Sequence, residues 1–120
     1  MKRLIVLTLL LAGCQASRPA VSHVVLCWLK EPGNAEARER LVATSKSFRS
    51  LPGVLDVRVG EPIPSPRPVV DSSFDVGVVI RFKDQAAMDA YEKSPAHQQA
   101  VKDVLGPLSK RLQIYDIAER

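Results

Sequence analysis

The chain has 120 residues, of which 17 are basic and 13 acidic, so its formal net charge is +4. This length fits one domain and excludes two large ones. Hydrophobic residues make up 46% of the chain and charged residues 25%, which is typical of a globular protein and argues against both disorder and a multi-span membrane protein. Two cysteines are too few for a disulfide scaffold.

The N-terminus has the pattern of a bacterial export signal. Met1-Lys2-Arg3 forms a positively charged head, and residues 4–12 form an apolar run that only Thr8 interrupts. This run is much shorter than the roughly 20 residues that span a bilayer. We therefore predict a secretory signal and not a stable transmembrane anchor.

The sequence Leu11-Ala12-Gly13-Cys14 resembles the bacterial lipoprotein box, in which a peptidase cuts before a cysteine that carries diacylglycerol. The resemblance predicts a signal peptide at residues 1–13, lipidation of Cys14, and a lipidated tether at residues 14–22. Several acyl chains give stable membrane attachment, so we expect an exported, membrane-anchored lipoprotein of the cell envelope. In a Gram-negative cell, Gln15 favours the outer membrane, facing the periplasm. A buried first strand or helix that contains a cysteine by chance is the alternative.

Hydrophobic periodicity predicts four strands and two helical regions after this tether. The strands are expected at residues 23–30, 54–60, 74–82 and about 112–117. The helices are expected at residues 34–50 and 84–106, with Asn34 and Asp84 as N-caps. Ser94-Pro95 predicts a break in the second region, where Ser94 caps a new helix.

Two further patterns concern the second strand and the segment that follows it. Leu55, Val57 and Val59 alternate with polar residues and are expected on one face of the strand. Prolines stand at every second position from Pro62 to Pro68. Because proline lacks an N–H and fixes φ, this segment cannot be a central strand and is predicted to be an exposed, polyproline-like loop.

The predicted order is strand, helix, strand, strand, helix, strand. It folds most simply as an α+β, ferredoxin-like antiparallel sheet with the helices on one face. The first and third strands are apolar on both sides, so the other face would expose a large apolar area. A second copy, packed sheet against sheet, covers it, which predicts a homodimer with a barrel-like interior.

Features along the whole domain resemble the stress-responsive dimeric α/β-barrel (Dabb) family. They are His23-Val24-Val25-Leu26, Phe74-Asp75-Val76, Phe82, Tyr91, Ser94-Pro95-Ala96-His97 and Tyr115-Asp116. The resemblance covers about residues 23–117 and implies a stress-response barrel domain at residues 23–120. It also implies a ferredoxin-like unit that dimerises into a barrel, in agreement with the predicted strand order.

One plant member of that family closes a polyketide chain by acid–base chemistry without a cofactor. Its catalytic tyrosine and histidine correspond to Tyr91 and His97, and a further pocket histidine corresponds to His23. Val76 stands where that enzyme has another pocket histidine, so the chain departs from the enzyme there. A histidine base beside a phenol is able to remove a proton next to a carbonyl and hold the resulting oxyanion. The alternative is that His97 fixes the helix junction while Tyr91 packs in the core.

These observations leave three functions open. The first is a barrel that binds a small apolar ligand in the dimer interior, in a pocket with His23, Val76 and Trp28, without established catalysis. Trp28 has the alternative role of a core or interface anchor. The second is a cofactor-independent cyclase, lyase or isomerase with His97 as base and Tyr91 as hydrogen-bond donor. The third is an interaction module whose interior is filled by side chains.

Other chemistry has little support in the sequence. Two histidines without a clustered acidic pattern give no metal-site spacing, and we expect no metal and no cofactor. The sequence has neither a glycine-rich phosphate loop nor a Gly-x-Ser-x-Gly turn. Its basic residues are scattered, which argues against nucleic-acid binding. Cys27 lies on an apolar strand and is predicted to be a buried thiol.

Overall fold

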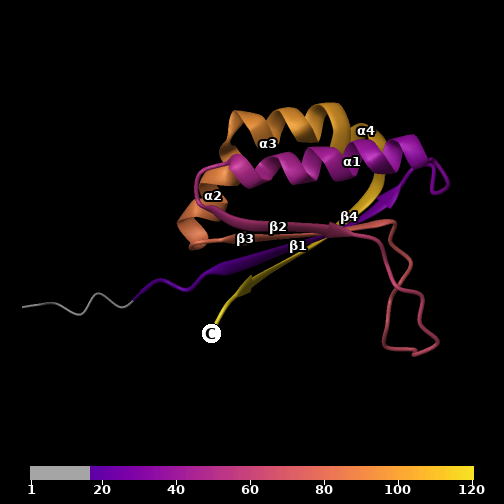
Figure 1. Cartoon of the computed structure of the whole chain (residues 1–120), viewed down its shortest axis with the longest axis horizontal. Coiled ribbons are helices and arrows are strands. Elements are labelled where there is room, and N and C mark those ends of the chain that lie inside the picture. The colour runs from indigo at the N-terminus through magenta and orange to yellow at the C-terminus, as the bar shows by residue number, and fades with distance from the viewer. Residues whose placement is uncertain (1–16) are drawn as a thin grey trace, which may run out of the picture.

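The computed structural model describes residues 17–120 as a four-stranded antiparallel sheet with its helices on one face (Figure 1). The elements are β1 (Val21–Leu29), α1 (Ala35–Ser47), β2 (Val54–Gly60), β3 (Val76–Phe82), α2 (Gln85–Lys93), α3 (Pro95–Ala100), α4 (Gly106–Leu108) and β4 (Ser109–Ala118). A 3₁₀ turn, η1 (Phe48–Ser50), ends α1, and a π turn, η2 (Val101–Leu105), joins α3 to α4. The strand order is β2-β3-β1-β4. The predicted ferredoxin-like fold is confirmed.

The chain enters the sheet earlier than the sequence predicts. The predicted signal peptide and Cys14 lie outside the described residues, but the end of the predicted tether does not. Val21 pairs with Phe82 of β3 and with Ala118 of β4, so β1 begins two residues before the expected domain start at His23. Among residues 17–120, no helix is both long and apolar enough to cross a membrane.

Strand register assigns each side chain to the helix-covered face or to the free face, because residues directly opposite each other in an antiparallel pair point to the same side. His23 lies opposite Ile80 of β3 and Asp116 of β4, and all three face the helices. The free face carries the neighbouring positions. Its exposed apolar side chains are Val79, Tyr115 and Ile117.

One prediction for β2 is wrong in detail. The register shifts between Val54 and Asp56, which leaves Leu55 as an extra residue in a bulge. Leu55 is therefore 52% exposed, whereas Val57 is 1% exposed and packs in the core. A pattern of strict alternation cannot reveal this extra residue, because the insertion moves the residues on its N-terminal side to the other face of the strand.

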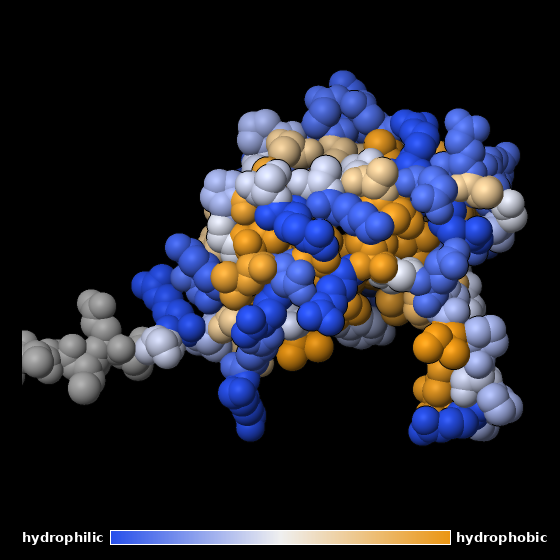
Figure 2. Space-filling view, in the orientation of Figure 1, coloured by the Kyte–Doolittle hydropathy of each residue, from blue (hydrophilic) through white to orange (hydrophobic). Residues whose placement is uncertain are grey.

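The segment between β2 and β3 is the predicted proline-rich loop. In Figure 1 it extends away from the sheet on the side opposite the helices. Ile63 and Val69 are 82% and 81% exposed, and apolar side chains are visible on this projection in Figure 2. At its base the carboxylate of Asp75 accepts a hydrogen bond from the backbone N–H of Leu29 at 2.8 Å, which fixes the loop to the end of β1.

Both predicted N-caps are confirmed. The Asn34 side chain accepts a hydrogen bond from the Ala37 N–H at 3.0 Å, and the Asp84 side chain accepts one from the Ala87 N–H at 2.8 Å. These bonds satisfy backbone donors that the first turn of a helix leaves without partners. The helical layer is thereby fixed at the starts of α1 and α2.

Gly53, in the turn before β2, gives a test of the packing between this turn and α2. Its φ is +78°, and a Cβ there would lie 2.6 Å from the Ala87 Cβ. We expect Gly53→Ala to lower the free energy of unfolding by at least about 1 kcal/mol, because the left-handed conformation and the clash both oppose it. Urea denaturation measures the change. Gly33→Ala is the matched control, since a Cβ at Gly33 would meet no atom within 4 Å, and an equal loss in both variants would contradict the argument.

Candidate functional site

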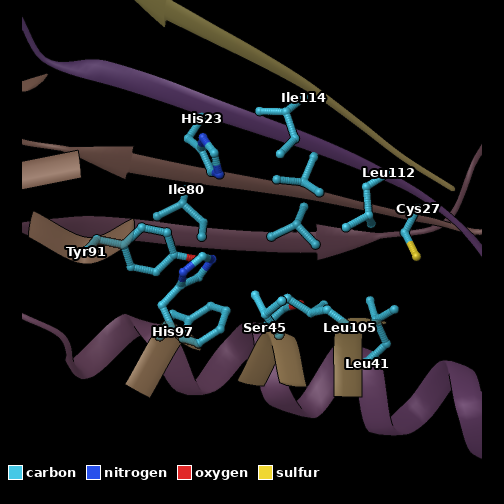
Figure 3. Close-up of a pocket in the computed structure, with 14 residues that line it drawn as sticks. His23, Cys27, Leu41, Ser45, Ile80, Tyr91, His97, Leu105, Leu112 and Ile114 are labelled. Carbon is cyan, nitrogen blue, oxygen red and sulfur yellow. The ribbon is translucent and has the colours of Figure 1, made fainter. Parts of the chain in front are cut away.

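A cavity of about 130 Å³ lies between the sheet and the helices of the chain (Figure 3). Its lining comes from β1, β3 and β4 on one side and from α1, α2, α3 and η2 on the other. The polar side chains His23, Tyr91 and His97 gather at one end. Cys27, Leu41, Leu105 and Leu112 lie at the other end. The cavity therefore has a polar end and an apolar body.

The break between α2 and α3 brings Tyr91 and His97 together. The Ser94 hydroxyl donates to the Tyr91 carbonyl at 2.6 Å and accepts from the His97 N–H at 3.2 Å. This capping turns the chain, so that the two rings lie with their centroids 4.5 Å apart. In Figure 3 the Tyr91 hydroxyl points towards the His97 ring. The predicted restart of the helix at Ser94-Pro95 is confirmed.

A backbone group holds the His97 ring. Its Nδ1 lies 3.0 Å from the carbonyl oxygen of Glu92. A carbonyl only accepts hydrogen bonds, so this contact assigns the Nδ1 proton and leaves Nε2 as the remaining polar atom of the neutral ring. Phe48 packs against the same ring, with centroids 6.1 Å apart. His97 is thus both a junction residue and a wall of the cavity.

Tyr91 is a hydrogen-bond donor in this environment. Its side chain is only 5% exposed, and it packs against Phe48 and Phe82 with ring centroids 5.4 and 5.0 Å away. Burial raises the pKa of the Tyr91 phenol well above its ordinary value, and the nearby Glu92 carboxylate raises it further. The phenol therefore keeps its proton at neutral pH and is suited to hydrogen-bond an oxygen in the cavity.

His23 has a carboxylate partner that the sequence did not reveal. Its Nδ1 lies 2.5 Å from Oδ1 of Asp116, the residue directly opposite it on β4. The His23 side chain is 5% exposed and the Asp116 side chain 41%. The ring also makes an edge contact with Tyr91, with centroids 6.0 Å apart. The only sequence signal for this pair was the closing Tyr115-Asp116, which does not specify a partner.

Glu92 completes a group of three potential metal ligands. Ligand atoms of His23, Glu92 and Asp116 all lie within 4.8 Å of one another. The expectation that no such cluster exists rested on spacing along the chain, and the fold brings together residues from β1, α2 and β4. The hydrogen bond between His23 and Asp116 by itself explains why these two are so close. Glu92 is exposed at the surface.

Small residues line the cavity where larger ones would fill it. Cys27 and Ser45 are 1% and 2% exposed and lie on β1 and α1. The Cys27 sulfur is 3.0 Å from the Ser109 hydroxyl, and burial raises the pKa of the Cys27 thiol. A protonated, buried thiol is a poor nucleophile, so Cys27 contributes packing and not reactivity.

Two residues assigned to the ligand pocket from the sequence do not line this cavity. Val76 is fully buried in the core. Trp28 lies in β1 on the opposite side of the sheet, where its indole N–H donates to the Ser73 hydroxyl at 3.1 Å and Arg111 lies 4.4 Å from its ring centroid. Its alternative role as an anchor matches these contacts. The period of a strand defines two faces but does not tell which face borders the cavity.

The π turn η2 forms part of the cavity wall. The N–H of Gly106 bonds to the Val101 carbonyl, and a Cβ at Gly106 would lie 2.9 Å from that oxygen. Pro107 follows, and it lacks the backbone N–H that a regular helix uses for its next hydrogen bond. Val101 and Leu105, at the two ends of this turn, both line the cavity. Single π turns inside helices are frequent at functional sites.

Comparison with known proteins supports the fold. A family model described as "Stress responsive A/B Barrel Domain" matches residues 21–118. A Dabb family protein with a ferredoxin-like fold from Mesorhizobium loti is 22% identical, with a TM-score of 0.71 over 86% of this chain and 99% of that one. A dimeric ferredoxin-like protein of unknown function from Thermobifida fusca is 14% identical, with a TM-score of 0.69 over 85% and 92%.

A plant enzyme is also among the similar structures. The hydroxynitrile lyase from Passiflora edulis is 15% identical, with a TM-score of 0.69 over 85% of this chain and 94% of that one. No curated protein matches the sequence significantly. Identities this low show a common fold and do not transfer an activity.

The raised pKa of Tyr91 gives a test of its burial. The folded state holds the phenol proton more tightly than the unfolded state does. The protonated phenol therefore makes its full contribution to the free energy of unfolding below the unfolded pKa of about 10, and this contribution is lost as pH rises above that value. We expect Tyr91→Phe to make the loss of stability above pH 10 less steep. Urea titrations between pH 8 and 11 measure this slope, with Tyr115→Phe, at a 53% exposed position, as the control. A Tyr91→Phe slope equal to that of the wild type would contradict the assignment.

Proposed function

Because the chain belongs to the stress-responsive A/B barrel (Dabb) domain family over residues 21–118, we propose that it binds a small, mainly apolar ligand in the cavity between sheet and helices. The observation that carries this proposal is the division of the cavity into an apolar body and a polar end formed by His23, Tyr91 and His97. Such a site binds a ring-sized hydrocarbon body and orients one oxygen on it.

The size of the cavity limits the ligand. A volume of about 130 Å³ is close to that of apolar cavities that accept benzene, about 150 Å³. Leu112 and Ile114 on β4 line the cavity and are 39% and 46% exposed, so one side of it is accessible. The proposed ligand therefore has a body of about one ring, and any substituent extends past β4 towards solvent.

We further propose that the protein is a homodimer that packs through the free face of its sheet. The similar structure from Thermobifida fusca is described as dimeric, which supports this assembly. Val79, Tyr115 and Ile117 expose apolar surface on that face. In such a dimer each copy keeps its own cavity on the other side of the sheet. The ligand would thus lie within each protomer and not, as the sequence suggested, between the two sheets.

The second candidate is cofactor-independent acid–base catalysis in the same cavity. The 4.5 Å separation of the Tyr91 and His97 rings and the raised pKa of Tyr91 favour it. One similar structure is a hydroxynitrile lyase, which supports the idea that this fold accommodates a lyase. In this scheme Tyr91 donates a hydrogen bond to an oxygen and a histidine moves the proton.

Native mass spectrometry of freshly isolated protein tests ligand binding and assembly together. We expect a dimer that carries up to one small molecule per protomer. Ser45→Leu should abolish the additional mass, because it fills the cavity, while the dimer remains. Thr44→Leu on the same helix is the control, since Thr44 does not line the cavity.

Phenol, added to protein freed of ligand, should bind the wild type and not Ser45→Leu in calorimetry. Monomeric protein would refute the dimer, and equal binding of phenol to both would refute the site.

Membrane attachment is proposed to depend on a lipid at Cys14. We expect Cys14→Ser in the full chain to move the protein from the membrane fraction to the soluble fraction or to leave it unprocessed. Cys27→Ser is the control and should remain membrane-bound. Immunoblotting of fractionated cells measures the distribution. Unchanged membrane attachment of Cys14→Ser would contradict the lipoprotein assignment.

A further inference from the structure

His23 is buried, and the partly exposed Asp116 carboxylate holds its ring in a way that the proposed binding function does not require. The two residues come from neighbouring strands, and their side chains meet at 2.5 Å at the polar end of the cavity. Binding one oxygen needs only a hydrogen-bonding side chain at this end, whereas a histidine held by a carboxylate also has a fixed tautomer and orientation. The pair therefore points to chemistry on a polar part of the ligand.

The contact with Asp116 decides which His23 nitrogen is basic. An ionised carboxylate only accepts hydrogen bonds, so Nδ1 of His23 carries the proton and Nε2 is left with a free lone pair. The ring lines the cavity and extends into it from β1 (Figure 3). His23 thus offers the cavity a proton acceptor whose orientation the Asp116 carboxylate fixes.

Two carboxylates lie near the His23 ring. Asp116 on β4 and Glu92 on α2 both place a carboxylate oxygen within 4.8 Å of a nitrogen of its ring. The other titratable groups that line this end of the cavity are Tyr91, which stays neutral because its pKa is raised, and His97. A buried imidazolium next to a carboxylate is stabilised by direct attraction, as in hydrolases with a histidine held by an aspartate.

His97 lacks this support. Its Nδ1 partner is the neutral carbonyl of Glu92 at 3.0 Å, which carries no full charge to offset an imidazolium. Of the two histidines, His23 is therefore the one whose ring a carboxylate holds in place.

We propose that His23 is the proton acceptor of the cavity, that Asp116 is its positioning residue, and that the substrates are small ketones or aldehydes with a proton on the carbon next to the carbonyl. This inference rests on the proposed binding of a small ligand in the same cavity. Nε2 of His23 takes the proton, the C–H electron pair forms a C=C bond, and the carbonyl oxygen becomes an enolate. Tyr91 donates a hydrogen bond to that oxygen. Return of the proton to either end of the enolate regenerates neutral His23, so no cofactor or oxidant is consumed.

Nitrogen-15 NMR tests the positioning step without any substrate. The chain has only two histidines, so His97→Gln leaves His23 as the single source of signals. We expect neutral His23 to carry its proton on Nδ1, and Asp116→Ala to shift the population towards the Nε2–H form. Asp89→Ala, an exposed acid on α2, is the control and should leave the tautomer unchanged. A wild-type His23 with its proton on Nε2 would overturn the proposal.

Exchange of the α-protons of cyclohexanone in D₂O tests the chemistry. This ketone has a ring-sized body and one oxygen, and proton NMR follows the exchange. We expect the wild type to catalyse it, His23→Gln to slow it by about a hundredfold or more, the usual contribution of a positioned base, and Asp116→Asn to slow it by a smaller factor. Asp89→Ala, at an exposed position outside the cavity lining, is the control and should retain the full rate.

The outcomes separate this inference from the binding function. Cyclohexanone that binds, as measured by shifts of its ligand signals, but does not exchange would overturn the proposal and leave binding intact. Loss of exchange in His97→Gln with full exchange in His23→Gln would overturn it as well. Failure of cyclohexanone and phenol to bind the wild type would refute the binding function itself, while the tautomer measurement would still decide the role of Asp116.

Discussion

The pairing of β1 with β4 is the constraint on which the polar end of the cavity depends. It places Asp116 directly opposite His23 and turns Leu112 and Ile114 to the helix-covered side. Because side chains alternate along a strand, a shift of one residue would move all three β4 side chains to the free face. β4 is an edge strand, bonded only to β1 in the sheet. The chemistry of the cavity therefore depends on the register of one pair of strands.

Local patterns in the sequence were sufficient to predict the fold and the Tyr91–His97 half of the site. The strands show short apolar runs, and the N-caps and Ser94-Pro95 mark where helices begin. Both kinds of signal act within a few residues, so they can be recognised without knowledge of the tertiary contacts. The break after Lys93 is the clearest case, since a serine cap followed by proline specifies a new helix and thereby the approach of the two rings.

The remainder of the site depends on contacts between distant parts of the chain. His23 and Asp116 are 93 positions apart, and only the strand order makes them neighbours. Trp28 could not be assigned to a face because β1 is apolar on both sides, so its period carries no information about which side the helices cover. Leu55 was misplaced for a related reason, since a bulge inserts one residue and leaves the apolar pattern unchanged.

The cavity is a specific feature of this core and not a general looseness of packing. Aromatic rings fill the region beside it, where Tyr91 packs against Phe48 and Phe82. Small side chains border the open volume, with Ser45 and Cys27 almost fully buried at positions where leucine would add contacts. By the relation between cavity volume and stability, an unfilled space of 130 Å³ lowers the free energy of unfolding by up to about 3 kcal/mol. Domains have a total stability of only about 5–15 kcal/mol, so a loss of this size is substantial. A ligand that occupies the cavity would restore part of that stability on binding, and this links the packing defect to the proposed function.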